Sequence, residues 1–66
     1  MFNITEIGFS GRRNIIATAA SFIEAKNKVE AMAPLYMEDD SDYPGCADAY
    51  LTGGRVVAIQ PEGFTL

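Results

Sequence analysis

The sequence predicts a small α+β domain of order ββαββ, with a single antiparallel sheet and one helix packed on one face. Three observations support this: alternating apolar residues near the N-terminus, a central amphipathic segment with a helix start signal, and two apolar runs around a glycine pair. At 66 residues, the chain is expected to form one domain over residues 1–66. It is too short for parallel strands joined by several crossovers, so an antiparallel sheet is favoured.

The N-terminal segment, residues 2–9, is predicted to form the first strand. Its apolar residues change from one face to the other part of the way along, which indicates a bulge near Glu6 or a strand that is apolar on both sides. Residues 10–14 contain turn formers, including a glycine. Ile15–Thr18 then predict a short returning strand.

The helix is predicted over Phe22–Ala33. Ser21 and Glu24 have the spacing of a capping box, in which each side chain accepts a hydrogen bond from the backbone N–H groups at the helix start. Pro34 lacks an N–H group and disfavours the helical conformation of its predecessor, so the helix should end just before it. The apolar stripe at helical spacing consists of Phe22, Ala25, Val29, Met32 and Ala33.

The segment after the helix carries a dense run of acids. Residues 38–42 include four carboxylates in five positions. Repulsion at this density disfavours regular structure and predicts a solvated loop. The apolar residues just before it, Leu35–Met37, are expected to pack over the end of the helix, and Tyr43–Gly45 are expected to form a turn.

The C-terminal part predicts a hairpin. Two apolar runs, at residues 47–51 and 55–60, flank the pair Gly53-Gly54. A two-residue turn at this pair would place Tyr50 opposite Val57. The core expected from all these elements consists of Ile4, Ile7, Ile15, Phe22, Ala25, Val29, Met32, Leu51, Val56 and Ala58.

The apolar pattern of this hairpin bears on function. One helix covers one face of a four-stranded sheet, yet the hairpin carries apolar residues on both faces. An uncovered apolar face, expected to present Tyr50, Val57 and Ile59, is typical of an interface. This interpretation predicts a non-enzymatic protein-interaction module, self-associating as a homodimer or forming part of a larger complex, that binds through the sheet face or an edge. The alternative is that the C-terminal tail and residues 35–37 cover the second face themselves.

The charge balance suggests other kinds of partner. Nine acids against five basic residues give a net charge of −4, which disfavours direct nucleic-acid binding. Arg12 and Arg13 lie together in a turn and are a candidate site for an acidic partner or for nucleic acid, with an ordinary exposed turn as the alternative. The alternative function is an acidic phage-type inhibitor, similar to anti-CRISPR proteins or nuclease inhibitors, by analogy of size, charge and architecture alone. Its contact residues would occupy a basic nucleic-acid-binding groove and would be Glu38, Asp39, Asp40 and Asp42.

Residues for catalysis or metal binding are few. The chain has no histidine, which removes the commonest general base. Cys46 therefore has no imidazole to activate it, and a small buried hydrophobic role is expected. Residues 40–45 resemble a calcium loop in part, but Pro44 and Leu51 stand where oxygen ligands are required. We therefore expect no enzymatic activity, no cofactor and no metal site.

The sequence also bears on the compartment. No run approaches the ~18 apolar residues of a membrane span. The N-terminus lacks the basic and apolar regions of a signal peptide, and the single cysteine fits a reducing environment. We therefore expect a cytoplasmic protein without membrane association.

Overall fold

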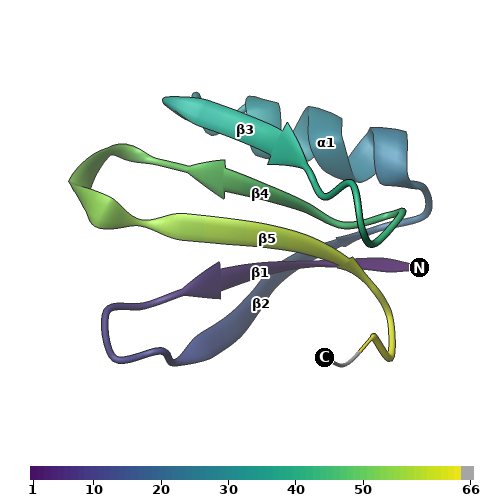
Figure 1. The fold of residues 1–66 in the computed structure, drawn as a ribbon, viewed down its shortest axis with the longest axis horizontal. Helices are drawn as coiled ribbons and strands as arrows, with labels where there is room; N and C mark the ends of the chain where they lie inside the picture. The colour runs from purple at the N-terminus through teal and green to yellow at the C-terminus, as the bar shows by residue number, and fades with distance from the viewer. Residues whose placement is uncertain (65–66) are drawn as a thin grey trace.

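The computed structural model describes residues 1–64, which form one antiparallel sheet with one α-helix on it (Figure 1). The strand order across the sheet is β2-β1-β5-β4-β3. The expected architecture is thus confirmed, with one strand more than the sequence predicted. The elements are β1 (Phe2–Ile7), β2 (Arg13–Ala19), α1 (Phe22–Glu30), β3 (Tyr36–Asp39), β4 (Ala47–Tyr50), a short 3-10 turn (Thr52–Gly54) and β5 (Val56–Pro61).

The additional strand is β3, which pairs with β4 at one edge of the sheet. The prediction of a loop for residues 38–42 is therefore wrong for its first two residues, and Tyr36 and Met37, expected to pack over the helix end, belong to this strand. Two contacts hold β3 in place, and the first of them also offsets part of the repulsion between the acids. Asp39 forms an ion pair with Lys26 of α1 at 3.0 Å, and the Leu35 N–H donates to the Tyr50 carbonyl at 2.8 Å. In both contacts the partner, Lys26 or Tyr50, lies far from β3 in the sequence, so the local sequence did not reveal the strand.

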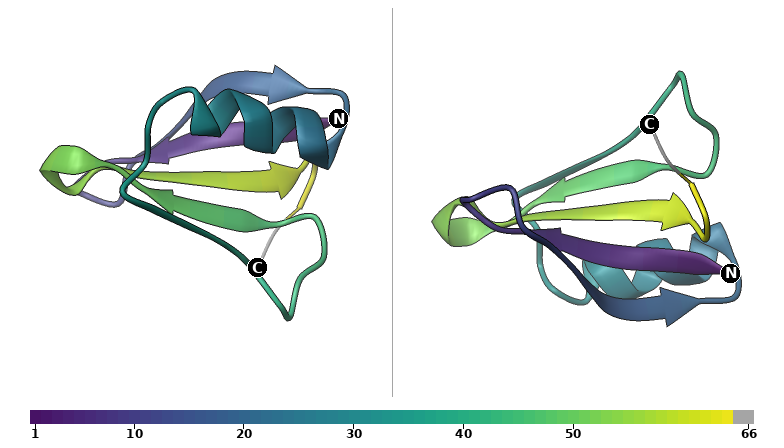
Figure 2. Two further views of the ribbon diagram at one scale, coloured as in Figure 1. Left: turned by 90° about the horizontal axis from the view of Figure 1, so that it is seen from above. Right: turned by 90° about the horizontal axis from the view of Figure 1, so that it is seen from below.

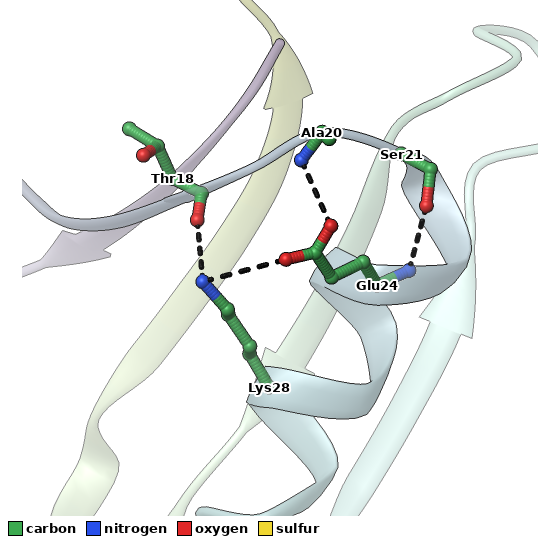
Figure 3. A network of polar contacts seen from close by, with 5 residues as sticks. All are labelled: Thr18, Ala20, Ser21, Glu24 and Lys28. Atoms are coloured by element: carbon green, nitrogen blue, oxygen red, sulfur yellow. Dashed lines mark hydrogen bonds and ion pairs between the residues drawn. The ribbon is translucent and has the colours of Figure 1, made fainter.

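The start of α1 is fixed by the capping residues (Figure 3). The Ser21 hydroxyl accepts from the Glu24 N–H at 3.1 Å, as predicted. The Glu24 carboxylate accepts from the Ala20 N–H at 3.1 Å, one residue earlier than in a standard capping box. Lys28 donates to the Thr18 carbonyl at 2.8 Å and so ties the helix to the end of β2.

The helix ends at Glu30, three residues before the predicted end at Ala33. The N–H of Ala33 donates to the Glu30 carbonyl, an i to i−3 bond that tightens the last turn. Ala33 has a φ of 55°, in the left-handed region that commonly ends a helix, and the following Pro34 cannot continue the helix. Within residues 1–64, no helix has the length and apolarity needed to cross a membrane.

The β1–β2 hairpin contains an irregularity, but it lies in β2. Ile4 pairs with Ala17 and Thr5 with Ile15, so Ile16 is the extra residue, whereas β1 pairs with β5 without a shift. Of the two alternatives predicted for the first strand, the strand that is apolar on both sides is therefore the one observed. The bounds of both strands differ from the prediction. β1 ends at Ile7 rather than at Phe9, and β2 extends beyond both ends of the predicted Ile15–Thr18. Regular alternation along β1 places Ile4 beneath the helix and Ile7 on the opposite face, which accounts for the two-sided apolar pattern of this segment.

The core lies between α1 and one face of the sheet. Of the expected core, Ile4, Ala25, Val29 and Leu51 are buried there, and Phe22 and Met32 pack against it half-buried. Four expected core residues do not lie there. Ala58 is buried, but on the opposite face of the sheet. Ile7 and Val56 are half-buried on the opposite face, and Ile15 is 61% exposed on the edge strand β2. The buried hydrophobic cluster is made of Ile4, Ala19, Ala25, Val29, Ala47, Ala49, Leu51, Val57 and Ile59.

The β4–β5 register corrects the predicted interaction face. The loop has three residues, Thr52–Gly54, closed by a hydrogen bond from the Leu51 N–H to the Arg55 carbonyl. Tyr50 therefore pairs with Val56 instead of Val57. A shift of one residue moves every side chain to the other face. The placement of Val57 and Ile59 on the uncovered face is consequently wrong: they are 0% and 1% exposed beneath the helix.

Candidate interaction site on the open face of the sheet

The face of the sheet opposite α1, called the open face here, has no helix over it in the part of the chain described (Figure 2). Its side chains follow from the cross-strand pairing, because directly opposed residues share a face. One row across the strands consists of Ile7, Val56, Tyr50 and Tyr36. The next row consists of Thr5, Ala58, Asp48 and Glu38.

The open face contains a hollow of about 260 Å³. Its apolar floor includes Val56 and Ala58, and the short side chain of Ala58 among longer neighbours leaves the depression. Aromatic rings stand around it. Tyr43 and Phe64 meet edge to face, with 5.6 Å between ring centroids, and Tyr50 also lines the hollow. Phe64, in the C-terminal tail expected to cover this face, borders the hollow, and the last two residues of the tail lie outside the described residues.

Two tyrosines extend the apolar surface toward β3. The rings of Tyr36 and Tyr50 stack with centroids 5.9 Å apart and an angle of 23° between their planes. The Tyr36 hydroxyl donates to a Glu38 carboxylate oxygen at 2.8 Å. This hydrogen bond, together with the negative charge of Glu38, raises the pKa of Tyr36. Tyr50, the remaining member of the predicted interaction face, does lie on the open face.

A half-buried carboxylate, Asp48, lines the hollow. Burial raises its pKa, and the charges of Asp40 and Glu38 raise it further, whereas Arg13 lowers it. Among residues 1–64, its carboxylate makes no hydrogen bond or ion pair. When ionised, the side chain is therefore a partly desolvated negative charge to which residues 1–64 supply no fixed counter-ion.

The four acids predicted as one interaction loop are not brought together. Glu38 lies on the open face, and Asp40 lines the hollow there. Asp39 lies on the helix side, paired with Lys26. Asp42 is exposed in the following loop, where its N–H donates to Asp40 at 2.9 Å. The sequence analysis did not name Asp48 as a site residue, although alternation along β4 places it on the face of Tyr50 whatever the register with β5.

The two arginines of the predicted basic site are also separated. Arg13 is the first residue of β2 and lines the hollow on the side away from β3. Arg12 is an exposed turn residue whose carbonyl accepts from the Gly8 N–H at 2.8 Å, and it does not line the hollow. Arg13 is thus the one cation among the lining residues that the structure describes.

The single thiol is poorly suited to nucleophilic chemistry. Cys46 is buried beside the hollow, and burial raises its pKa, with further contributions from Asp40 and Asp48. A raised pKa disfavours the reactive thiolate. Among the residues described, no three or more acids or cysteines are grouped so that they could hold one metal ion. The hollow thus offers apolar, aromatic and anionic contacts, which suit binding.

Together, the fold and this hollow define a small α+β domain with an open-faced antiparallel sheet. In comparisons with protein-family models, curated proteins and solved structures, nothing matched the chain. What the domain binds is therefore inferred from the geometry and chemistry of the open face.

Proposed function

We propose that this chain is a non-enzymatic protein-interaction module that binds a protein partner through the open face of its sheet. The main support is the stacked pair Tyr36 and Tyr50 beside the apolar floor of the hollow, left uncovered by residues 1–64. Aromatic residues next to a small apolar depression are typical of interface centres, because they bury much area at a low cost in side-chain entropy.

The chemistry of the nucleophilic residues supports a binding role. Cys46 has a raised pKa, and the Ser21 hydroxyl is engaged as the helix cap. The hollow of about 260 Å³ lies below the ~300–1,000 Å³ of typical small-molecule pockets. These features favour recognition of a protein surface over turnover of a substrate.

A sheet edge offers a second surface for the same function. β2 is an edge strand on which Ile15 and Ile16 are 61% and 44% exposed. It contains no proline or lysine, the residues that commonly protect an edge from pairing. Pairing of two copies through β2 would be the self-associating form of the module.

The alternative function, an acidic inhibitor whose contact loop is residues 38–42, has less support from the positions of its acids. It requires the acids of residues 38–42 to act as one surface, whereas Asp39 is paired with Lys26 on the helix side. The acids that share the open face are Glu38 and Asp48, with Asp40 at the hollow. Negative charge therefore contributes to the open face and does not form a separate loop site.

Site-specific photo-crosslinking in cells that naturally express the chain tests the proposal. A photoreactive amino acid replaces Tyr50 on the open face or, as a control, Ile23, which is 73% exposed on the helix. We expect a discrete protein adduct from position 50 and none from position 23. An adduct of twice the chain mass would show self-association, which light scattering over a concentration series measures independently. Adducts from position 23 alone would contradict binding through the open face.

A further inference from the structure

We propose that the hollow on the open face receives a lysine or arginine side chain from a basic segment of the partner protein. This inference rests on the proposed function, and it adds the chemical class of the partner and the residues that recognise it. The recognition site is the half-buried Asp48 together with the aromatic rings around it.

The shape and lining of the hollow fit one long cationic side chain. A volume of about 260 Å³ is too small for most cofactors but accommodates an extended side chain. Lysine and arginine bury their aliphatic stems against apolar surface and keep the charged end near a polar group. Val56 and Ala58 provide the apolar floor, and Asp48 provides the anionic end.

The aromatic rings strengthen the case for a cation. Tyr50, Tyr43 and Phe64 all line the hollow. A guanidinium or ammonium group within about 6 Å of such a ring is attracted to its negative face. The combination of aromatic walls and a carboxylate attracts a cation by both mechanisms and offers little to an anion.

The net charge of the face distinguishes a basic partner from a second copy. Glu38, Asp40 and Asp48 lie on or beside it, and Arg13 is the one cation lining the hollow in the described part of the chain. Two copies stacked through this face would bring two acidic surfaces together, which costs binding energy. A basic segment would neutralise the same charges and is the occupant that they favour.

Asp48 also opposes folding in the free chain. Its pKa is raised first by burial and then by Asp40 and Glu38, so its ionised form is less stable here than in water. No ion pair from Arg13 to Asp48 is formed within residues 1–64. An ionised group that destabilises the fold is typical of a functional site, where binding supplies the missing partner.

An NMR titration of the full isotope-labelled chain tests the inference. The probe is a capped glycine-serine peptide containing two arginines, and the control peptide has neutral citrulline at the same positions. We expect the arginine peptide to shift the amide signals of Asp48, Tyr50, Ala58 and Gln60, and the citrulline peptide to leave them in place. Asp48→Asn should weaken binding about tenfold, because it removes a charge-assisted contact.

The matched control is Asp39→Asn, which makes the same change of charge on the opposite side of the sheet. It should leave the affinity for the arginine peptide within about twofold. An equal loss in both variants would show non-specific attraction and overturn the inference, as would equal shifts with citrulline. Shifts of the same amides with protein concentration alone would assign the face to a second copy instead.

The two experiments separate the two proposals. Crosslinking from position 50 without a response to the arginine peptide would leave the interaction module standing and remove the cation site. Binding of the arginine peptide that depends on Asp48, without crosslinking from position 50 in cells, would keep the cation site and remove the proposed protein partner. The amide spectra of the variants show directly whether each remains folded.

Discussion

Lys26 and Asp39 form an ion pair of 3.0 Å that joins the helix to the edge strand β3. The ammonium group of Lys26 also lies 5.2 Å from the centroid of the Phe22 ring. Lys26 therefore contacts both Asp39 of β3 and the ring of Phe22, which packs against the core. Alternation along β3 places Asp39 on the helix side and Glu38 on the open face, so the acids of this segment are divided between the two sides of the sheet.

Loss of this pair should affect stability slightly and in a salt-dependent way. We expect Asp39→Asn to lower the free energy of unfolding by about 0.5 kcal/mol, since both partners are partly exposed to water. Urea unfolding at low and high ionic strength measures the effect, which should shrink in high salt. Asp42→Asn, in the same segment without an ion pair, is the control. An equal loss from both variants would show that the pair does not hold β3.

The helix cap should make a larger contribution. Ser21→Ala removes the acceptor for the Glu24 N–H and should cost about 1 kcal/mol. Ser21→Asp retains an acceptor and should keep most of the stability. Thermal unfolding followed by circular dichroism compares the three proteins. If the alanine variant is as stable as the aspartate variant, the cap does not limit helix stability.

The register of β4 and β5 can be tested with two adjacent valines. Val57 is fully buried beneath the helix, whereas Val56 is half-buried on the open face. Val57→Ala should therefore cost about 2 kcal/mol through lost burial and a cavity, and Val56→Ala less than about 1 kcal/mol. Chemical denaturation gives both values. The reverse order would support the register with a two-residue turn.

Two glycines with similar backbone strain have different surroundings. Gly53 and Gly45 have φ values of 77° and 86°, so alanine at either position adopts a conformation that costs about 1 kcal/mol. A Cβ atom at Gly53 would meet nothing within 4 Å, but at Gly45 it would lie 3.2 Å from the Phe2 ring. Phe2 packs against the core, so Gly45→Ala should be the more destabilising of the two. Equal melting temperatures for the two variants would show that the Phe2 ring can move away from the added Cβ atom at little cost in stability.

The stability of the chain should depend on the ionisation of Asp48. Because the folded state raises its pKa, the folded state binds this proton more tightly than the unfolded state. Stability from this group is present below its ordinary pKa and is lost as pH rises through the raised value. Asp48→Asn should therefore stabilise the chain at neutral pH by up to about 1 kcal/mol, discounted for partial exposure. The gain should vanish in acid, as thermal unfolding across the pH range would show; a constant gain would exclude ionisation as its cause.

Short-range patterns were sufficient for much of the fold. The capping pair Ser21 and Glu24 and the apolar stripe located the helix, and alternation located the four strands that were predicted. Each of these signals lies within a few residues of the element it specifies. The helix end was overestimated because the apolar stripe continues to Ala33, although the backbone has left the helical conformation there.

Features that depend on distant contacts or on loop length were not predictable in the same way. β3 forms beside β4, supported by Lys26, which lies 13 residues from Asp39. The glycine pair is compatible with a two-residue or a three-residue loop, and the observed loop of Thr52–Gly54 changed the face of every residue in one strand relative to the other. For this reason Val57 and Ile59 were predicted to lie on the open face with Tyr50, whereas they are buried beneath the helix.

The buried thiol at the hollow gives the chain a built-in reporter. Cys46 is the one cysteine in the sequence, so a thiol-specific reagent modifies a single known position without any substitution. Its labelling rate is governed by how often the surrounding side chains move aside, and it rises in alkaline solution as the thiolate forms. A ligand bound in the hollow would slow the reaction of Cys46 with the reagent. The labelling rate therefore measures occupancy of the site in the native chain.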